Sequence, residues 1–402
     1  MPPDLALSSE EQPWQPRAAP IAGDRRTFHT TYNASVPAQI ANMGFDLDDD
    51  VVATAEDARA TIVRFDERLS ALLGGDAEFA PMSSVLLRTE STSSSQIENI
   101  TAGARALALA ELGITRFGSN ANQVVANVDA MQRAIALADD VTSASILAIH
   151  DALMRDQPRI GPGVFRDEPV WIGGGGLSPH GATYVAPHHT RVPEAIEDLC
   201  AFTRRRNLPL IAQAAIAHAQ FETIHPFADG NGRTGRALVH AMLKQGHATT
   251  RTTVPISAGL LSNTATYYEA LNAYRRGDPN TIVARFTEAT YAAIANSDTL
   301  AGDLHAIHQD WNLKLTARKD SVAWRILPVL LSQPAVTSKV VQRRCRASQP
   351  AADRALKQLL DAEIVRSKDE HGEGRKRDVV WRSDDVLQAL DQFGERARRR
   401  TG

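Results

Sequence analysis

Apolar residues recur every three to four positions along most of this chain, which is the spacing of one buried face of an α-helix. The first such stretch covers residues 56–73 and is followed by Gly74 and Gly75, a pair typical of a helix end. The next covers residues 81–99 and has a middle rich in Ser and Thr. Further stripes of the same period lie in residues 124–135, 146–154, 196–202, 211–222, 234–245, 264–276, 281–296 and 300–315. The pattern therefore predicts a mainly α-helical main body.

Two segments of the main body lack this period. Residues 158–193 are rich in Gly, Pro and aromatic residues, and the runs 171–176 and 182–185 favour a β-hairpin or flap. The first 35 residues are rich in Pro, Ser, Ala and Arg, which is typical of a tail or an extended strap. We expect one inserted hairpin and little regular structure at the start of the chain.

The last eighty residues have a different organisation. Helical patterns cover residues 322–331, 338–344 and 349–360. Residues 364–366 and 379–381 are apolar runs on either side of a charged turn that contains Gly, as in a hairpin. Three helices followed by a hairpin are typical of a winged helix-turn-helix.

Charge separates the same two parts. Residues 321–402 contain 17 Lys and Arg and 11 Asp and Glu, a balance of +6. Because the whole chain carries −3, residues 1–320 carry −9. A basic module beside an acidic body raises the alternative of a nucleic-acid partner, although moderate positive charge is more often only a solvated surface.

Several classes of protein are disfavoured. A length of 402 residues predicts two or three folded units, and no run of about 18 apolar residues predicts a membrane span. The start of the chain lacks the basic and apolar segments of an export signal. Cys200 and Cys345 lie far apart, as a reducing cytoplasm tolerates, and no Cys/His cluster has the spacing of a zinc site. We expect a cytoplasmic protein.

Candidate chemistry is concentrated in residues 225–236, His-Pro-Phe-Ala-Asp-Gly-Asn-Gly-Arg-Thr-Gly-Arg. This run lies between two helical patterns, so its Gly-rich centre opens onto a helix N-terminus, where amides and the helix dipole attract phosphate. Asp229 is a suitable oxygen ligand for Mg²⁺ on a polyphosphate, and Arg233 and Arg236 share one helix face as donors to phosphate. His225 is a candidate general base. Taken singly, each of these residues is more often structural.

Taken together, these residues resemble the signature of the Fic family, His-x-Phe-x-(Asp/Glu)-Gly-Asn-Gly-Arg-x-x-Arg, at every fixed position. The resemblance extends over about residues 50–300. It includes segments similar to the family's flap region, to its approach to the catalytic loop and to its segment over the nucleotide base: 163–166, 171–173, 184–187, 221–224 and 267–271. One departure is Ala186, where many relatives have a second proline, and it concerns flap rigidity and target choice.

The resemblance implies transfer of AMP from ATP to a hydroxyl side chain of a target protein. His225 would accept the hydroxyl proton, and Asp229 would hold Mg²⁺ between the α- and β-phosphates. The flap residues Ile172, Tyr184 and Val185 would dock an extended segment of the target by strand addition.

The same resemblance implies the nucleotide contacts. Asn231 and nearby amides would form an anion hole for the α-phosphate, Arg236 would hold the γ-phosphate and Arg233 the adjoining phosphates. The implied nucleotide-binding residues are Gly230, Asn231, Gly232, Arg233, Thr234, Gly235, Arg236, Tyr267 and Tyr268.

An upstream segment resembles the family's inhibitory motif, (Ser/Thr)-x-x-x-Glu-(Gly/Asn), in Ser94, Glu98 and Asn99. By itself this run is an ordinary Ser-rich helix end. Beside the signature, it implies that the Glu98 carboxylate pairs with Arg236 and competes with the γ-phosphate.

The expected architecture is therefore a Fic-type helical core with an inserted β-hairpin flap and a C-terminal winged helix-turn-helix. Its expected parts are a tail or strap (1–50), a helical region with the inhibitory helix (51–120), the catalytic core (121–300), a linker helix (301–320) and the winged-helix domain (321–395).

Three functions stay open from the sequence. The first is an auto-inhibited protein adenylyltransferase that uses ATP and Mg²⁺ and also modifies itself. The second is a DNA-binding regulator whose Fic body senses nucleotide, with Gln349, Asp353, Arg354 and Lys357 reading bases and residues 375–377 contacting phosphate. The third is a relative that transfers another group or removes AMP. The C-terminal module could instead serve dimerisation or target docking, and a homodimer is left open.

Overall fold

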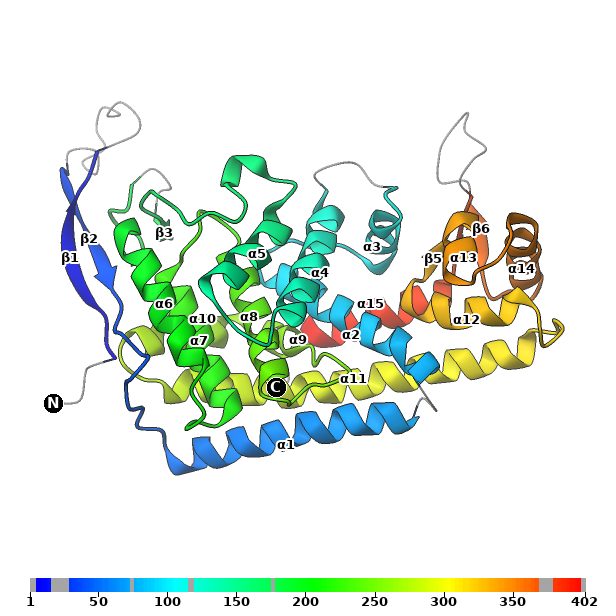
Figure 1. Cartoon of the computed structure of the whole chain (residues 1–402), viewed down its shortest axis with the longest axis horizontal. Helices are drawn as coiled ribbons and strands as arrows, with labels where there is room; N and C mark the ends of the chain where they lie inside the picture. Colours follow the sequence, from blue (N-terminus) through cyan, green and yellow to red (C-terminus); the bar gives the residue numbers. More distant parts are fainter. Residues whose placement is uncertain are drawn as a thin grey trace. The chain divides into compact units, whose positions relative to one another are not determined.

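The computed structural model describes residues 5–15, 29–72, 76–114, 119–174, 178–368 and 379–398. These residues form a mainly α-helical fold with small β-sheets (Figure 1). The chain divides into two compact units, each assembled from segments that are not consecutive in the sequence. The first unit consists of residues 1–60, 129–248 and 263–288, and the second of residues 61–128, 249–262 and 289–402.

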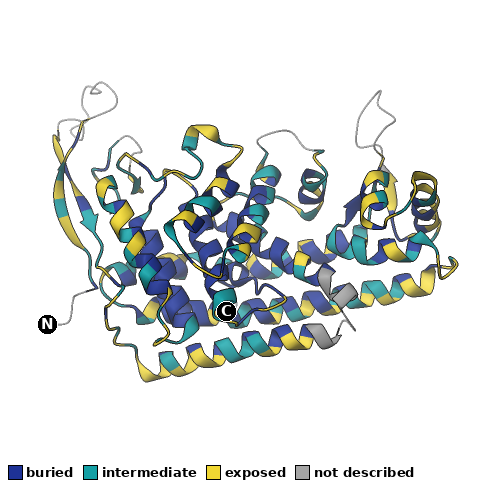
Figure 2. Cartoon of the chain, in the orientation of Figure 1, coloured by how far each residue is buried: buried dark blue, intermediate teal, exposed yellow. Residues whose placement is uncertain are grey.

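The first unit is built around a buried central helix, α7 (Leu210–Ile224). Every residue of α7 after Leu210 is buried, so the helix is enclosed on all sides (Figure 2). It packs against α6 (Val192–Thr203), α8 (Asn231–Gln245) and α10 (Thr264–Arg275). The other helical segments of the unit are the start of α1 (Asp49–Leu72), the end of α4 (Asn120–Ala136), α5 (Ser143–Met154), η2 (Pro158–Ile160), η3 (His189–Arg191) and the start of α11 (Asn280–Lys314).

The start of the chain has more regular structure than the sequence predicted. Little regular structure was expected there, but β1 (Ser8–Pro13) pairs antiparallel with β2 (Thr31–Val36). The hairpin is held by tertiary contacts that local pattern does not reveal. Trp14 packs edge-on against Tyr32 and against Trp171, with ring centroids 6.0 Å and 5.7 Å apart.

The predicted flap hairpin is present as two short strands. β3 (Trp171–Ile172) pairs antiparallel with β4 (Tyr184–Val185). Gly175 and Gly176, which belong to the predicted hairpin, lie outside the described residues, as do Gly74 and Gly75.

The second unit is organised around α2 (Asp76–Ile97), which packs against α9 (Ile256–Leu261), α12 (Val322–Ser332) and α15 (Asp384–Arg398). The unit also contains α3 (Ala104–Glu111), α13 (Ser338–Arg344) and α14 (Gln349–Asp361). The strands β5 (Ala335–Val336), β6 (Arg366–Lys368) and β7 (Val380–Arg382) form an antiparallel sheet in the order β5-β7-β6.

Several features of this part differ from the sequence prediction, and α3 and α9 had no predicted counterpart. The helix α15 was not predicted, although Val386, Leu390 and Phe393 recur at helical spacing and are buried. Strand β5 was also missed, because two residues carry too little periodicity. The stripes predicted at 281–296 and 300–315 belong to one continuous helix, α11, which ends at Lys314.

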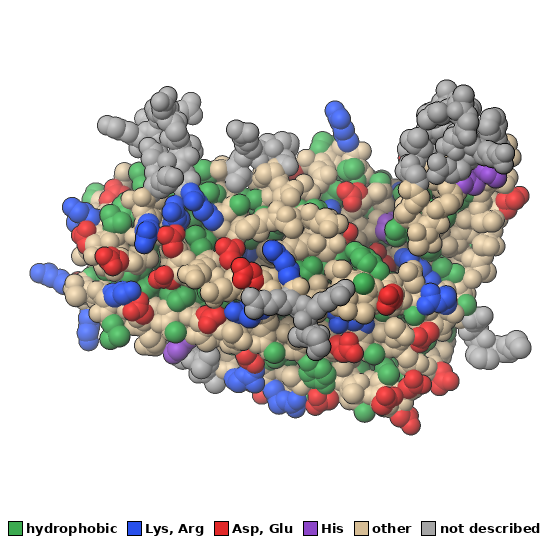
Figure 3. All heavy atoms as spheres, turned by 180° about the vertical axis from the view of Figure 1, so that it is seen from behind, with side chains coloured by type: hydrophobic (Ala, Val, Ile, Leu, Met, Phe, Trp, Pro, Cys, Tyr) green, Lys and Arg blue, Asp and Glu red, His purple; other side chains and the backbone are tan. Residues whose placement is uncertain are grey.

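No helix among the described residues is long and apolar enough to cross a membrane. Acidic and basic side chains are interspersed on the face that Figure 3 presents. The sign difference between residues 1–320 and 321–402 is therefore not visible there as two separate patches.

Candidate active site

The candidate site begins where α7 ends. The N–H of His225 donates to the Phe221 carbonyl oxygen at 2.9 Å, and His225 itself has φ 50° and ψ 61°. This left-handed conformation stops the helix, and His adopts it more readily than most residues other than glycine. The imidazole is left partly accessible, with 19% of the side chain exposed.

Arg166 fastens this turn to the flap. Its Nε donates to the His225 carbonyl oxygen at 2.7 Å, and its Nη2 donates to the Pro187 carbonyl oxygen at 2.6 Å. Burial lowers the pKa of the guanidinium to about 10, so it stays charged at neutral pH. No role was predicted for Arg166 from the sequence, where its position among Gly and aromatic residues was the available signal.

The side chain of His150 packs against the loop 225–236. Its ring is stacked on Phe227 at a centroid distance of 3.6 Å and an interplanar angle of 3°. The Gly163 N–H donates to Nδ1 at 3.1 Å, so the proton is on Nε2, which donates to the Asp229 carbonyl oxygen at 3.1 Å. Burial lowers the pKa of His150 to about 4 and keeps the ring neutral. This residue was also missed, because its helical pattern on α5 does not distinguish it from a core histidine.

The side chain of Asn231 closes the loop through two hydrogen bonds to the backbone of Phe227. Its Oδ1 accepts from the Phe227 N–H at 2.9 Å, and its Nδ2 donates to the Phe227 carbonyl oxygen at 2.8 Å. The contribution of Asn231 to an anion hole for the α-phosphate stays a prediction. Gly230 has φ 79°, and a Cβ there would lie 3.1 Å from Met154 Sδ, so the turn needs glycine.

The helix α8 begins at Asn231, three residues before the predicted start at Thr234. Its first intrahelical hydrogen bond runs from the Thr234 N–H to the Gly230 carbonyl oxygen at 3.0 Å. The Gly230 N–H donates to Asp229 Oδ1 at 2.6 Å. The amides of Thr234 and Gly230 thus donate within the protein here, and their predicted place around the α-phosphate stays a prediction. The amides of Asn231, Gly232 and Arg233 precede the first intrahelical hydrogen bond, at the N-terminal end of α8.

Asp229 fits a magnesium ion only together with substrate oxygens. Its side chain is 53% exposed, and its Oδ1 lies 3.8 Å from Arg233 Nη2. No cluster of three or more His, Cys, Asp or Glu residues that could hold a metal occurs among the described residues. Mg²⁺ commonly takes one carboxylate together with phosphate and water oxygens, and Asp229 matches that requirement.

The two arginines of the signature are buried within the first unit. Arg233 and Arg236 are each 2% exposed, and Arg233 Nη2 lies 3.9 Å from Met154 Sδ. Burial, assisted by the nearby Arg236 charge, lowers the pKa of His218 to about 3. Gly235 faces α7, because a Cβ there would lie 2.9 Å from Phe221 Cδ1. Gly235 is thus a helix-packing position in a segment expected to bind nucleotide.

The predicted base-pocket and flap residues differ in exposure. Tyr267 is 1% exposed and its hydroxyl lies 2.7 Å from His218 Nε2, whereas Tyr268 is 45% exposed. On the flap, Tyr184 is buried and donates to the Thr223 carbonyl oxygen at 2.5 Å. Ile172 is 41% exposed, and Val185 is half-buried.

The candidate inhibitory motif lies at the end of α2, in the second unit. Ser94 is fully buried, while Glu98 and Asn99 follow the last helical residue and are exposed. Asn99 has φ 61°, and the N–H of Ile100 donates to the Ser95 carbonyl oxygen at 3.0 Å. A left-handed residue after a helix favours Gly or Asn, which accounts physically for the last position of the motif.

Comparisons with known families match two consecutive parts of the chain. Residues 140–243 match the model of the Fic/DOC family, and residues 52–136 match the model of the N-terminal region of that family. The first match includes the loop 225–236, and the second includes the motif at the end of α2.

Individual relatives are similar over shorter shares of their length. Protein adenylyltransferase fic-1 of Caenorhabditis elegans is 26% identical over 191 residues, which is 47% of this chain and 35% of that protein. Protein adenylyltransferase Fic of Nematostella vectensis is 39% identical over 90 residues, which is 22% of this chain and 20% of that protein. The chain thus spans about a third or less of these relatives.

A solved structure is similar over a larger share. A crystal structure of a Fic family protein from Desulfovibrio desulfuricans G20 aligns with a TM-score of 0.49 and 22% identity. The alignment covers 81% of this chain and 95% of that one.

Proposed function

We propose that this chain is a protein adenylyltransferase of the Fic/DOC family, which transfers AMP from ATP to a hydroxyl side chain of a protein. The matches of residues 140–243 and 52–136 to the two models of that family support the proposal. The observation that carries the proposal is the loop between α7 and α8. Within residues 225–236 it combines a partly exposed imidazole, an exposed carboxylate and the amides of a helix N-terminus. These are a base, a metal ligand and an anion site.

In this proposal, His225 takes the proton from the target hydroxyl. Its Nδ1 lies 3.4 Å from the Glu222 carbonyl oxygen, which can only accept, so Nδ1 carries the hydrogen and Nε2 the lone pair. Glu222 Oε2 lies 3.8 Å from Nδ1 and stabilises the imidazolium once the proton has been taken up.

The phosphates are held by the start of α8. The amides of Asn231, Gly232 and Arg233 and the helix dipole bind the α-phosphate, and the buried guanidiniums of Arg233 and Arg236 bind the remaining phosphates. Asp229 would hold Mg²⁺, which supplies charge neutralisation for the departing pyrophosphate. Groups that are positioned before the substrate arrives need little rearrangement in the transition state.

The motif at the end of α2 acts as a brake in the same proposal. Glu98 pairs with Arg236 and thereby competes with the γ-phosphate of ATP. Support comes from the motif's three matching residues and from the left-handed conformation of Asn99, which ends the helix directly after Glu98.

The test is self-modification with Mg·ATP. Glu98→Gly should gain an AMP adduct much faster than the wild type, and Glu98→Gly with His225→Ala should gain none, as measured by intact-mass spectrometry. If Glu98→Gly is labelled no faster than the wild type, the inhibitory role of Glu98 is wrong. An adduct of another mass would mean that the protein transfers a group other than AMP. Incubating an AMP-modified target with the protein tests removal of AMP.

Target docking is proposed to use the flap. The backbone edge of β3 and β4 can pair with an extended segment of the target, and the exposed Ile172 side chain can contact its residues.

A second candidate function rests on the second unit. The helices α12, α13 and α14 and the sheet β5-β7-β6 have the elements of a winged helix, and Gln349, Arg354 and Lys357 of α14 are exposed. Asp353 is also exposed but accepts from Ser338 Oγ at 2.6 Å. The proposed wing residues 375–377 lie outside the described residues.

Gel shifts with genomic fragments at low and moderate salt test this function, since DNA binding weakens steeply with salt. A shift that persists in His225→Ala favours a regulator that does not need catalysis. If no DNA shift occurs at low salt, the remaining roles for this module are dimerisation and protein docking. Light scattering of the full chain measures whether it is a dimer.

A further inference from the structure

The last turns of α2, which lead to Glu98, are rich in buried serine. Hydroxyls in these turns bond back to their own helix. Ser91 Oγ donates to the Leu87 carbonyl oxygen at 2.9 Å, and Ser95 Oγ donates to the Ser91 carbonyl oxygen at 2.8 Å. A hydroxyl whose hydrogen is used in this way does not donate to a neighbouring element. The position of these turns therefore depends on contacts that other elements make.

One such contact comes from the side chain of Asn127, on α4. Asn127 is fully buried, and its Nδ2 donates to the Ser91 carbonyl oxygen at 2.8 Å and to Ser95 Oγ at 3.1 Å. Because a carbonyl oxygen can only accept, the amide nitrogen must face Ser91, and this fixes the orientation of the side chain. Both hydrogens of Nδ2 are thus used on α2.

The other end of the Asn127 amide gains nothing. Its Oδ1 is buried and has no hydrogen-bond partner within the described parts of the chain. An unsatisfied buried acceptor lowers stability and offsets part of what the two Nδ2 hydrogen bonds contribute. Buried polar side chains of this kind can specify one arrangement of neighbouring helices at little gain in stability. The distinct effect of Asn127 is therefore on where the end of α2 lies.

Ser95 links this contact to Glu98. The Ser95 carbonyl oxygen accepts from the Glu98 N–H at 3.1 Å and from the Ile100 N–H at 3.0 Å. Positions 91, 95 and 98 are four and three residues apart, so they follow one side of the helix and of the turn that ends it. Asn127 thus holds the residue to which the Glu98 amide is bonded.

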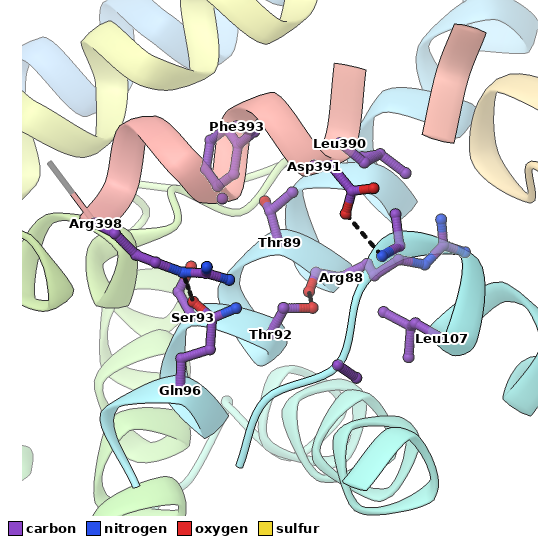
Figure 4. A pocket seen from close by; sticks show the side chains of 13 residues that line it. Arg88, Thr89, Thr92, Ser93, Gln96, Leu107, Leu390, Asp391, Phe393 and Arg398 are labelled. Atoms are coloured by element: carbon purple, nitrogen blue, oxygen red, sulfur yellow. Dashed lines mark hydrogen bonds between the residues drawn. The ribbon is translucent and has the colours of Figure 1, made fainter. Parts of the chain in front are cut away.

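Another side of α2 borders a cavity of about 50 Å³, which α3 and α15 complete (Figure 4). Thr92, Ser93 and Gln96 line the cavity, and Arg398 Nε donates to Gln96 Oε1 at a long 3.5 Å. Side chains at a void lack packing contacts on that side, whereas close-packed helices have little freedom. The end of α2 consequently has room to shift if its hydrogen bonds to Asn127 are lost.

Earlier turns of α2 are held independently of Asn127. Glu90 is fully buried and accepts from the Ser257 N–H at 2.8 Å and from Ser257 Oγ at 2.5 Å. Arg88 donates to Glu111 through two nitrogens, at 2.7 Å and 2.8 Å. Loss of the Asn127 side chain should therefore loosen the last turns and leave the rest of the helix in place.

We propose that Asn127 is a positioning residue for Glu98, because its two hydrogen bonds to α2 fix the turn that carries the inhibitory carboxylate. The proposal rests on the inhibitory role proposed above for Glu98. Without these hydrogen bonds, the end of α2 occupies a wider range of positions, and Glu98 inhibits less.

Hydrogen exchange of the full chain tests the positioning without reference to activity. Asn127→Leu keeps the shape of the side chain and removes the donor. The Ser91 carbonyl oxygen still accepts from Ser95 Oγ, so the variant should fold with an unfolding midpoint near that of the wild type. Loss of ordinary hydrogen bonds should speed exchange of the amides of residues 98–100 about fivefold. Unchanged exchange at these amides overturns the positioning role.

Self-labelling with Mg·ATP tests the link to inhibition. Asn127→Leu should be labelled about fivefold faster than the wild type, whereas in the Glu98→Gly background it should add no further increase. A merely structural role predicts the same change in both backgrounds. Asn296→Leu is the matched control, because it removes an asparagine donor to the Phe393 carbonyl oxygen at 3.2 Å and should be labelled at the wild-type rate.

The outcomes separate this proposal from the proposed function. If Glu98→Gly is labelled faster than the wild type and a folded Asn127→Leu is not, the positioning role is wrong and the inhibitory role stands. If neither is labelled faster, the inhibitory role is wrong, and this proposal with it.

A smaller variant covers the case in which Asn127→Leu does not fold. Asn127→Ala removes the same donor without adding volume, so it should fold and show the same faster exchange and labelling. Wild-type exchange and labelling in a folded Asn127→Ala protein overturn the proposal.

Discussion

The guanidinium of Arg166 donates to the carbonyl oxygen of His225 at 2.7 Å, so a buried cation holds the backbone of the candidate base. The same side chain reaches the carbonyl oxygens of Pro187 at 2.6 Å, of Glu168 at 2.9 Å and of Ile224 at 3.4 Å. One residue thus connects the end of α7 with both ends of the flap. The position of the imidazole depends on a side chain outside the loop that contains it.

Arg166→Lys should slow self-labelling about 10²-fold in the Glu98→Gly background, because lysine keeps the charge but cannot reach the same carbonyls, and small displacements of a catalytic group are costly. ATP affinity should stay within about twofold, since Arg233 and Arg236 lie on α8. Labelling time courses and calorimetric ATP titrations measure the two quantities. The exposed Arg159→Lys is the control, and equal losses of affinity and rate would indicate a structural role only.

Stability should fall with acidification. Burial lowers the pKa of His150 to about 4 and that of His218 to about 3, from an ordinary 6.5. The unfolded chain therefore takes up protons that the folded chain refuses, and the stabilisation is complete above pH 6.5 and is lost towards pH 4. Each histidine lowers the free energy of unfolding by roughly 2 kcal/mol between pH 7.5 and pH 5. Urea unfolding of wild type and His150→Gln should show a shallower pH dependence in the variant; equal slopes would contradict the role of His150.

Asn99 should tolerate glycine but not a β-branched residue. At φ 61°, Asn99→Val places a crowded side chain in the left-handed region and should cost about 1–2 kcal/mol, whereas Asn99→Gly should be nearly neutral. If Glu98 acts as a brake, the strained end of α2 should also raise self-labelling in Asn99→Val. Calorimetric unfolding and labelling of both variants give the answer, and two variants with the same midpoint would speak against the helix-end geometry.

Replacing Gly235 even by alanine should destabilise the protein. A Cβ there would lie 2.9 Å from Phe221 Cδ1 and 3.1 Å from His218 Nδ1, so Gly235→Ala should separate α7 from α8 and cost about 1–3 kcal/mol. Gly302→Ala on α11 is the matched control, because nothing lies within 4 Å of its Cβ, and it should stabilise the helix by about 0.5–1 kcal/mol. Denaturant midpoints of both variants measure the difference, and an unchanged Gly235→Ala would mean that the helices have room to adjust.

The spacing of apolar residues in the sequence predicted most helices of both units. In α7, α10 and α14, for example, apolar residues recur at helical spacing within the segment itself. The hairpin β1–β2 was not predicted, because Trp14 and Tyr32 are buried by packing on each other and on the flap strand that contains Trp171. The helix α15 carried the same period as the others and could have been predicted. Its partners α2, α3 and α9 could not, because they are distant in sequence.

Within the candidate site, sequence and structure contributed different facts. The order of residue types in 225–236 and the resemblance it carries identify which loop holds a base, a carboxylate and phosphate-binding groups. The assignment of atoms within the loop needed coordinates. The Asn231 side chain hydrogen-bonds to the Phe227 backbone, and Gly235 faces α7. The Thr234 N–H makes the first hydrogen bond of the helix.

The sequence by itself determined the mainly helical class, the flap and the chemistry of one loop, because these depend on residue types and on spacing within single segments. Tertiary structure decided which of those residues remain available to a ligand. Hydrogen bonds and close packing are set by neighbours far along the chain, as Gly163 with His150 and Arg166 with Pro187 demonstrate. Availability is a property of three-dimensional surroundings, and no local pattern encodes it.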